Sequence, residues 1–183
     1  MPKTNNVTYG KPAVSGAVSV APVGTTLPKD AKEKLDVIFK NLGYISEDGF
    51  TNTNSPETDS IKAWGGDTVL VLQTSKDDTF ATTFIESLNI NVLKLIYGDE
   101  NVTGDLATGI KVKANAKPQK PYSFVVDQIL AEGALKRIVI PSATITELGE
   151  IVYKDDEPVG YETTLQATPD KDGNTHFEYI IKE

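Results

Sequence analysis

Residues 122–140, YSFVVDQILAEGALKRIVI, contain two runs of apolar, often β-branched residues on either side of Glu132-Gly133. Such runs, bounded by Pro121 and a glycine turn, are typical of paired β-strands. Similar runs follow to the end of the chain, and the strands predicted in this half cover residues 122–130, 135–140, 144–148, 151–154, 161–167 and 177–181. Strands about ten residues apart, with helices segregated from them, predict a mainly β fold, an antiparallel sandwich or partial barrel.

Two segments have apolar residues at helical spacing. The first lies between Asp30 and Gly43, with apolar residues at Leu35, Ile38, Phe39 and Leu42. It predicts a short N-terminal helix. The second runs from Ser87, a suitable N-cap, to Tyr97, with apolar residues at Leu88, Val92, Leu95 and Ile96. It predicts one helix that flanks the sheet and ends at Gly98.

A polar stretch without apolar periodicity runs from Phe50 to Lys62, FTNTNSPETDSIK, and is followed by Ala63-Trp64-Gly65-Gly66. Two β-rich runs come next, residues 68–74 and 79–85, with a turn predicted at residues 75–78. Loops this long are uncommon in compact domains and usually carry function or are disordered. We therefore predict that residues 50–66 form a docking loop, disordered in the free subunit. Trp64, the only tryptophan, suits either docking or the core of its own domain.

Length and composition favour one domain over residues 1–183, with 39% hydrophobic and 24% charged residues. Residues 1 to about 26 lack a sustained period and predict an extended N-terminal arm. The net charge of −8 offers no counterion release to a nucleic acid, so specific DNA binding is not expected. The chain shows neither the pattern of an export signal nor an apolar run long enough to span a membrane.

Few residues suit catalysis or metal binding. There is no cysteine, one histidine, His176, and one arginine, Arg137. The segment Asp170-Lys-Asp-Gly-Asn174 has a calcium-like start, but its spacing fails and a hairpin turn is favoured. The acidic groups 77–78, 99–100 and 155–157 fall at predicted turns, which favours solvated carboxylates over a glycosidase pair. We predict no enzyme, no metal and no cofactor.

Other classes of protein remain open on these residues alone. A monomeric carbohydrate-binding or adhesion module would need an exposed aromatic platform, for which Trp64, Tyr161 and Tyr179 are the plausible members. A hydrolase that depends on a carboxylate is a more distant alternative.

Several segments together carry a family resemblance: VAPVGTTLP at 20–28, LGYISEDG at 42–49, IKAWGG at 61–66, VYKDD at 152–156 and the final Asp-Gly turn. In this order they resemble the major tail proteins, or tail tube proteins, of long-tailed siphophages and prophages of Gram-positive bacteria. The resemblance covers nearly the whole chain. It implies a β-sandwich with a flanking helix and a structural protein of the virion tail, which self-assembles into stacked hexameric rings, the conduit for DNA ejection.

The resemblance also implies partners and contact residues. The partners are other copies of the chain, a tape measure protein inside the tube, and tail terminator and distal tail proteins at its ends. DNA passes through without specific binding, no membrane is involved, and assembly takes place in the bacterial host cytoplasm. The bridging elements are the loop at 50–66, the N-terminal arm at 1–20 and a C-terminal hairpin or arm at 170–183. The expected inter-subunit contact residues are Phe50, Thr51, Asn52, Ile61, Trp64 and His176.

Overall fold

Strand β9 (Leu135–Leu148) organises the main sheet, because three strands share its two edges. The computed structural model describes residues 2–14 and 16–182. Strand β8 (Tyr122–Ile129) pairs with one edge of β9, with Val125 opposite Val139. On the other edge, β10 (Tyr161–Ala167) pairs with the second half of β9, and β11 (Phe177–Ile181) pairs with the first half.

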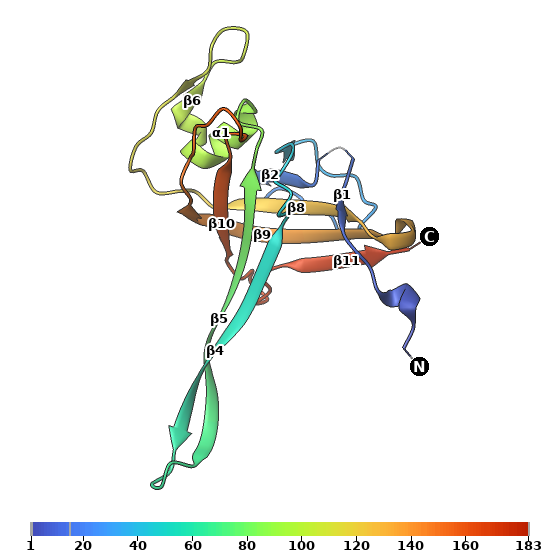
Figure 1. The fold of residues 1–183 in the computed structure, drawn as a ribbon, viewed down its shortest axis with the longest axis vertical. Coiled ribbons are helices and arrows are strands. Elements are labelled where there is room, and N and C mark those ends of the chain that lie inside the picture. The colour runs from blue at the N-terminus through green and yellow to red at the C-terminus, as the bar shows by residue number, and fades with distance from the viewer. Residues whose placement is uncertain (1, 15, 183) are drawn as a thin grey trace.

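The sheet extends from β9 in both directions (Figure 1). Its strand order is β3-β2-β8-β9-β10-β5-β4, with β1 also paired to β8 and β11 to β9. The remaining strands are β1 (Lys11–Pro12), β2 (Val18–Pro22), β3 (Lys40–Asn41), β4 (Thr51–Lys62) and β5 (Thr68–Phe84), with β6 (Val102–Thr103) and β7 (Lys111–Val112) forming a separate pair. Short 3-10 turns lie at Thr4–Asn6, Asp99–Asn101 and Ala131–Gly133. All pairings in the main sheet are antiparallel, and the sheet does not close into a barrel.

One α-helix, α1 (Ile90–Tyr97), packs against the sheet and completes the core. Its buried face consists of Val92, Leu93, Leu95 and Ile96. The predicted flanking helix and its end at Gly98 are confirmed, but the cap is not Ser87. The N-cap is Asn89, two residues later, whose side chain accepts a hydrogen bond from the backbone N–H of Asn91 at 3.0 Å.

The predicted mainly β, antiparallel fold is confirmed, with differences in the strands themselves. The runs predicted at 135–140 and 144–148 form one strand through Pro141. The register between β8 and β9 shifts at this point, with one extra residue on the β9 side, and the Ser123 hydroxyl donates to the Pro141 carbonyl at 2.6 Å. Residues 151–154 form no strand. The turn at 170–174 is present, with the N–H of Asp170 donating to Asn174 O, but β11 pairs with β9 rather than with β10.

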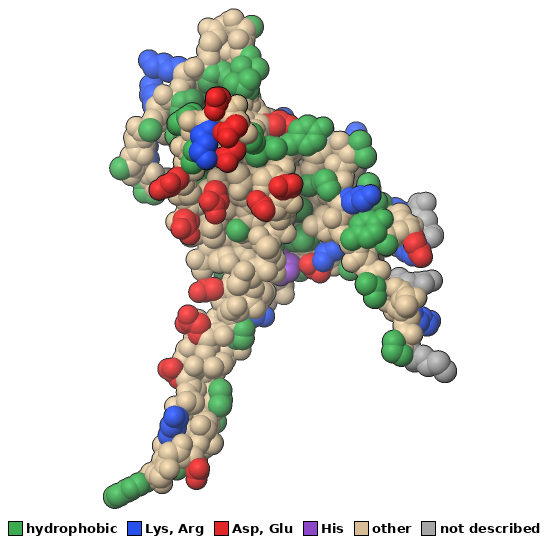
Figure 2. All heavy atoms as spheres, viewed as in Figure 1, with side chains coloured by type: hydrophobic (Ala, Val, Ile, Leu, Met, Phe, Trp, Pro, Cys, Tyr) green, Lys and Arg blue, Asp and Glu red, His purple; other side chains and the backbone are tan. Residues whose placement is uncertain are grey.

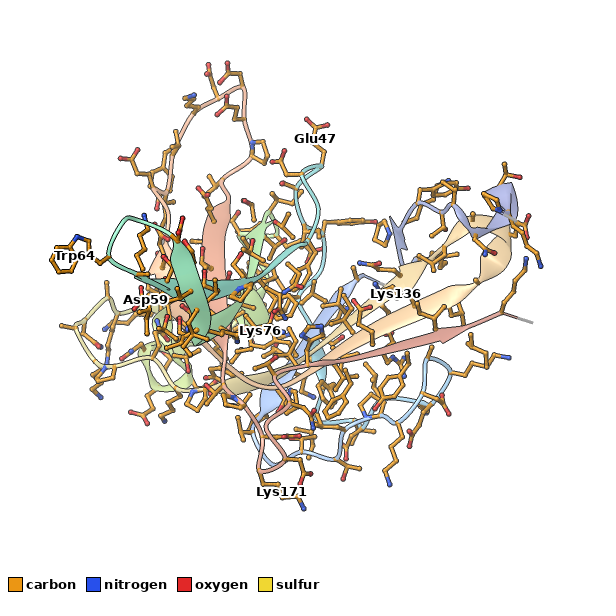
Figure 3. All side chains as sticks on the ribbon, turned by 90° about the horizontal axis from the view of Figure 1, so that it is seen from below. Glu47, Asp59, Trp64, Lys76, Lys136 and Lys171 are labelled. Carbon is orange, nitrogen blue, oxygen red and sulfur yellow. The ribbon has the colours of Figure 1, made fainter. Side chains whose placement is uncertain are left out.

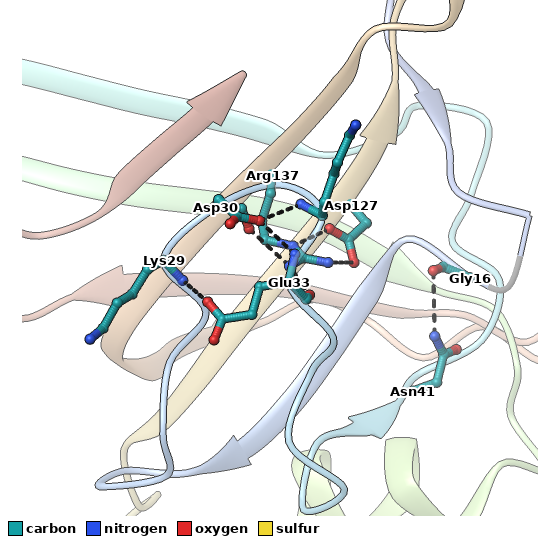
Figure 4. Close-up of polar contacts among 8 residues, drawn as sticks. Gly16, Lys29, Asp30, Glu33, Asn41, Asp127 and Arg137 are labelled. Carbon is teal, nitrogen blue, oxygen red and sulfur yellow. Dashed lines mark hydrogen bonds and ion pairs between the residues drawn. The ribbon is translucent and has the colours of Figure 1, made fainter. Parts of the chain in front are cut away.

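The predicted N-terminal helix is wrong, and the single arginine explains why (Figure 4). Arg137 is buried, and its guanidinium donates to both Asp127 carboxylate oxygens at 2.6 and 3.1 Å. Its Nη1 also donates to the carbonyls of Asp30 and Glu33, at 3.0 and 2.6 Å. The Asp30 carboxylate accepts the N–H groups of Lys32 and Glu33, as a helix N-cap would. The carbonyls of Asp30 and Glu33, which a helix would bond to its own N–H groups, are bound by Arg137 instead.

The two predicted arms are partly built into the sheet. Residues 18–22 form β2, in which Val18 is completely buried opposite Val126 of β8. Residues 7–12 are exposed, although Lys11 and Pro12 pair with β8, and β11 brings residues 177–181 of the C-terminal arm into the sheet. Met1, Ser15 and Glu183, which belong to the predicted arms, lie outside the described residues.

Candidate assembly surface

Strands β4 and β5 form a long hairpin that projects from the body (Figure 1). They pair from Thr51 opposite Ala81 to Lys62 opposite Thr68. Residues 79–84 of β5 also pair with β10, which anchors the hairpin in the sheet. We call residues 54–78 the outer hairpin, because in this part β4 and β5 pair only with each other.

The predictions of a loop at 50–66 and of a turn at 75–78 are therefore wrong. Every β4 side chain is exposed, so no face of the strand is buried and no apolar alternation marks it. Pro56 is tolerated because β4 is an edge strand, where a missing N–H breaks no ladder. The true turn is at residues 63–67, where Gly65 and Gly66 have φ values of +113° and +98° that favour glycine.

The root of the hairpin is held by a buried carboxylate, Asp78. Its Oδ1 accepts a hydrogen bond from Asn52 Nδ2 at 2.7 Å. Its Oδ2 accepts the Thr175 hydroxyl at 2.5 Å and lies 2.6 Å from His176 Nδ1. Two of these partners come from the segment that leads into β11. The cluster therefore ties the hairpin to the C-terminal part of the chain.

Hydrogen bonding keeps Asp78 ionised in spite of its burial. Burial raises the pKa of the carboxyl group, but hydrogen bonds from Thr175, Asn52 and His176 and the attraction of His176 lower it, and the net pKa lies below its ordinary value. The His176 ring also packs edge-on against Phe80, with 5.4 Å between ring centroids.

The tip of the hairpin is apolar and fully accessible. The Trp64 side chain is 106% exposed, the value of a residue with no neighbour against it. Figure 3 shows it pointing away from the body. Close behind it lies a run of exposed apolar side chains: Ile61, Val69, Leu70, Val71 and Leu72. Successive side chains of a strand point to opposite faces, so these residues give both faces of the hairpin exposed apolar surface, which is typical of sites of protein contact.

The predicted contact residues divide into two groups. Ile61 and Trp64 lie toward the tip. Phe50, Asn52 and His176 meet at the root, around Phe80 and Asp78, and Thr51 donates from its hydroxyl to Ala81 O at 3.2 Å. The structure thus places Trp64 outside the core of its own domain.

The prediction that residues 77–78 are solvated turn carboxylates is wrong for Asp78, which is buried within β5. Besides this role of Asp78, sequence reasoning missed Thr175 and the apolar residues at 69–72. An aspartate in a Thr-rich strand that precedes buried Phe80 was the available signal for Asp78.

The three aromatic residues considered for a carbohydrate platform do not share a surface. Tyr161 is buried and packs against Tyr97, with 6.2 Å between ring centroids. Tyr179 stacks on Phe177, while Trp64 stands at the hairpin tip. Acidic side chains are spread over the visible face of the body and along the hairpin (Figure 2). Within residues 2–14 and 16–182, no three acidic or histidine side chains are grouped to hold a metal ion. In the same described ranges, no helix has the length and apolar character needed to cross a membrane.

The fold and the hairpin define a mainly β protein with a projecting extension whose tip exposes apolar side chains. Residues 3–183 match the sequence model of the family described as phage tail tube protein. The chain therefore belongs to the phage tail tube protein family, and it is a structural component of the virion tail. A comparison with curated proteins gives no match.

Proposed function

We propose that this chain self-assembles into hexameric rings that stack into the tail tube, the conduit through which DNA is ejected. The observation that carries this proposal is the projecting outer hairpin, whose apolar tip has no partner within the subunit. Burying a Trp-sized apolar side chain against a neighbour favours association by about 1.5–3 kcal/mol before the costs of association.

The division between tip and root assigns roles to the predicted contact residues. Ile61 and Trp64 contact a neighbouring subunit directly. Phe50, Thr51, Asn52 and His176 hold the hairpin in its projecting position through the contacts at its root. The N-terminal segment and the C-terminal segment at 170–183 provide further contacts between subunits.

The proposed role involves no catalysis. The net charge of −8 supports passage of DNA without specific binding, since an acidic wall repels phosphates. The partners are further copies of the chain, a tape measure protein within the tube, and tail terminator and distal tail proteins at its ends. Assembly takes place in the cytoplasm of a bacterium infected by a siphophage.

A truncated hairpin tests the proposal. In this variant Asn-Gly replaces residues 57–75, so that Pro56 and Lys76, which are paired opposite each other, flank a two-residue turn. We expect a folded monomer by circular dichroism and no tubes by negative-stain electron microscopy. Normal tubes from this variant would show that the hairpin is not the bridge.

Substitution of the tip gives a graded version of the same test. Trp64→Ala is expected to raise the critical concentration for polymerisation at least about 30-fold, the effect of losing an interface hot spot of about 2 kcal/mol. The matched control is Leu106→Ala, because Leu106 is also exposed, at 67%, but lies in the loop between β6 and β7. Equal effects of the two variants would contradict a special role for Trp64.

A further inference from the structure

An apolar pocket lies at the root of the hairpin, at the opposite end from Trp64. It is formed between residues 10–13 with Gly16 and Ala17, residues 43–47 with Gly49 and Phe50, and strand β8, and its volume is about 310 Å³. Pro12, Ile45 and Phe50 form its walls, and the buried side chains of Ala17 and Val126 line it deeper in. A liquid water occupies about 30 Å³, so the pocket has space for an indole ring.

We propose that the Trp64 side chain of one subunit inserts into this root pocket of another subunit. The inference rests on the proposed function and names the two surfaces that meet. Trp64 cannot reach the pocket of its own chain. Phe50 lines the pocket just before β4 begins, and Trp64 follows the end of that 12-residue strand. Twelve extended residues span about 40 Å, and pairing to β5 keeps them extended.

Charged residues beside Trp64 and at the edge of the root pocket are complementary. Trp64 is flanked by Lys62 and by Asp67, whose carbonyl accepts the N–H of Ala63 at 2.8 Å. The exposed side chains at the edge of the pocket include Lys11 and Glu47, one from each wall. An inserted tip can therefore pair Lys62 with Glu47 and Asp67 with Lys11. A second cavity, near the C-terminus of α1, is lined by four charged residues, Asp99, Glu100, Lys117 and Lys120, and is therefore less suited to an indole.

The contact has a geometric consequence. Tip and pocket are different surfaces of the same chain, so their interaction is heterologous and repeats from subunit to subunit without closing as a dimer. Because they lie at the two ends of the hairpin, two subunits joined by this contact are offset from each other by about the length of the hairpin, about 40 Å. Image analysis of tubes measures this offset directly.

Site-directed cross-linking tests the contact, helped by the absence of cysteine from the native chain. Ala63→Cys places a thiol beside Trp64 and leaves the indole intact. Tyr44→Cys places one at the edge of the pocket, where Tyr44 is 70% exposed. The control pairs Ala63→Cys with Lys171→Cys, since Lys171 is exposed and lies across the body from Glu47 (Figure 3).

Assembled tubes of each double variant are treated with a short bismaleimide. We expect a ladder of covalent multimers from the Ala63/Tyr44 pair and little beyond background from the control. Tubes that form normally without this ladder, or with an equal ladder from the control, would overturn the inference and leave the proposed function standing. If the parent chain forms no tubes under any assembly condition, the proposed function fails and the inference fails with it.

A charge exchange provides the second readout. Lys62→Glu and Glu47→Lys are each expected to raise the critical concentration about fivefold, the effect of about 1 kcal/mol at a partly exposed pair. The double variant is expected to return to within about twofold of the parent. Additive losses in the double variant would show that these two side chains do not meet.

Discussion

Replacement of Asp78 by alanine should weaken the body of the protein far more than a typical strand substitution. The carboxylate is 1% exposed and is within hydrogen-bonding distance of Asn52, Thr175 and His176. A hydrogen bond to a charged group contributes about 1.5–3 kcal/mol, and removing one partner of a buried charged cluster costs about 3–5 kcal/mol. We expect Asp78→Ala to lower the free energy of unfolding by about 3–5 kcal/mol at pH 7.

Urea denaturation, followed by the far-UV circular dichroism of the backbone, measures this change in the free energy of unfolding. The neighbouring residue supplies the control: Asp77 is exposed and accepts one hydrogen bond from Gln166 at 3.0 Å. Asp77→Ala should change stability by no more than about 0.5 kcal/mol. Asp78→Asn should fall between the two, because an amide oxygen can still accept but its NH2 group faces other donors.

The pH dependence provides a further check on Asp78. Its folded-state pKa lies below the ordinary 3.8, so its contribution is present above that pH and is lost as pH falls through the lowered pKa. The difference between parent and Asp78→Ala should therefore shrink in acid. A difference below about 1 kcal/mol at pH 7, or one that grows in acid, would refute the role given to the cluster.

Three further predictions concern the body and the hairpin. Arg137→Lys should lower the free energy of unfolding by about 2–4 kcal/mol, because an ammonium cannot make the two-pronged contact with Asp127 while holding two carbonyls; a loss under about 1 kcal/mol in urea would contradict this. Burial and the Asp99 charge raise the Tyr122 pKa to about 12. The neutral Tyr122 hydroxyl therefore stabilises the fold fully below a pH of about 10, and this contribution is lost as the pH rises toward 12. Tyr122→Phe should flatten the decline in stability at alkaline pH, and an unchanged decline would contradict this prediction. Amide hydrogens of residues 57–75 should exchange much faster than those of β8 and β9 in the monomer, since the outer hairpin buries little surface; equal protection would mean that the hairpin packs on the body.

Much of the body could be predicted because its strands obey simple burial rules. Residues 122–129 and 161–167 have runs or alternations of apolar side chains that match a sheet with a covered face. The helical stripe from Val92 to Ile96 packs on that face as its spacing indicated. In each case local pattern and tertiary environment favour the same structure.

The hairpin and the N-terminal segment could not be predicted, for different reasons. The outer hairpin is exposed on both sides, so hydrophobic periodicity carries no information about it, and its strands are specified by pairing alone. In the N-terminal segment, a helical pattern is overridden by Arg137, which lies more than 100 residues later in the chain. Contacts at that separation leave no local signal in the sequence.

The way in which strands share β9 also governs the order of folding during synthesis. The β4–β5 and β8–β9 hairpins are local and can form as soon as they leave the ribosome. β2, however, must wait for β8, with Val18 paired to Val126, and one edge of β9 is completed only by β10 and β11 near the C-terminus. The Asp78 cluster likewise needs Thr175 and His176. The strands of the hairpin are thus synthesised well before the strands that complete the sheet. Truncated chains would have an unpaired β9 edge, which favours misassembly.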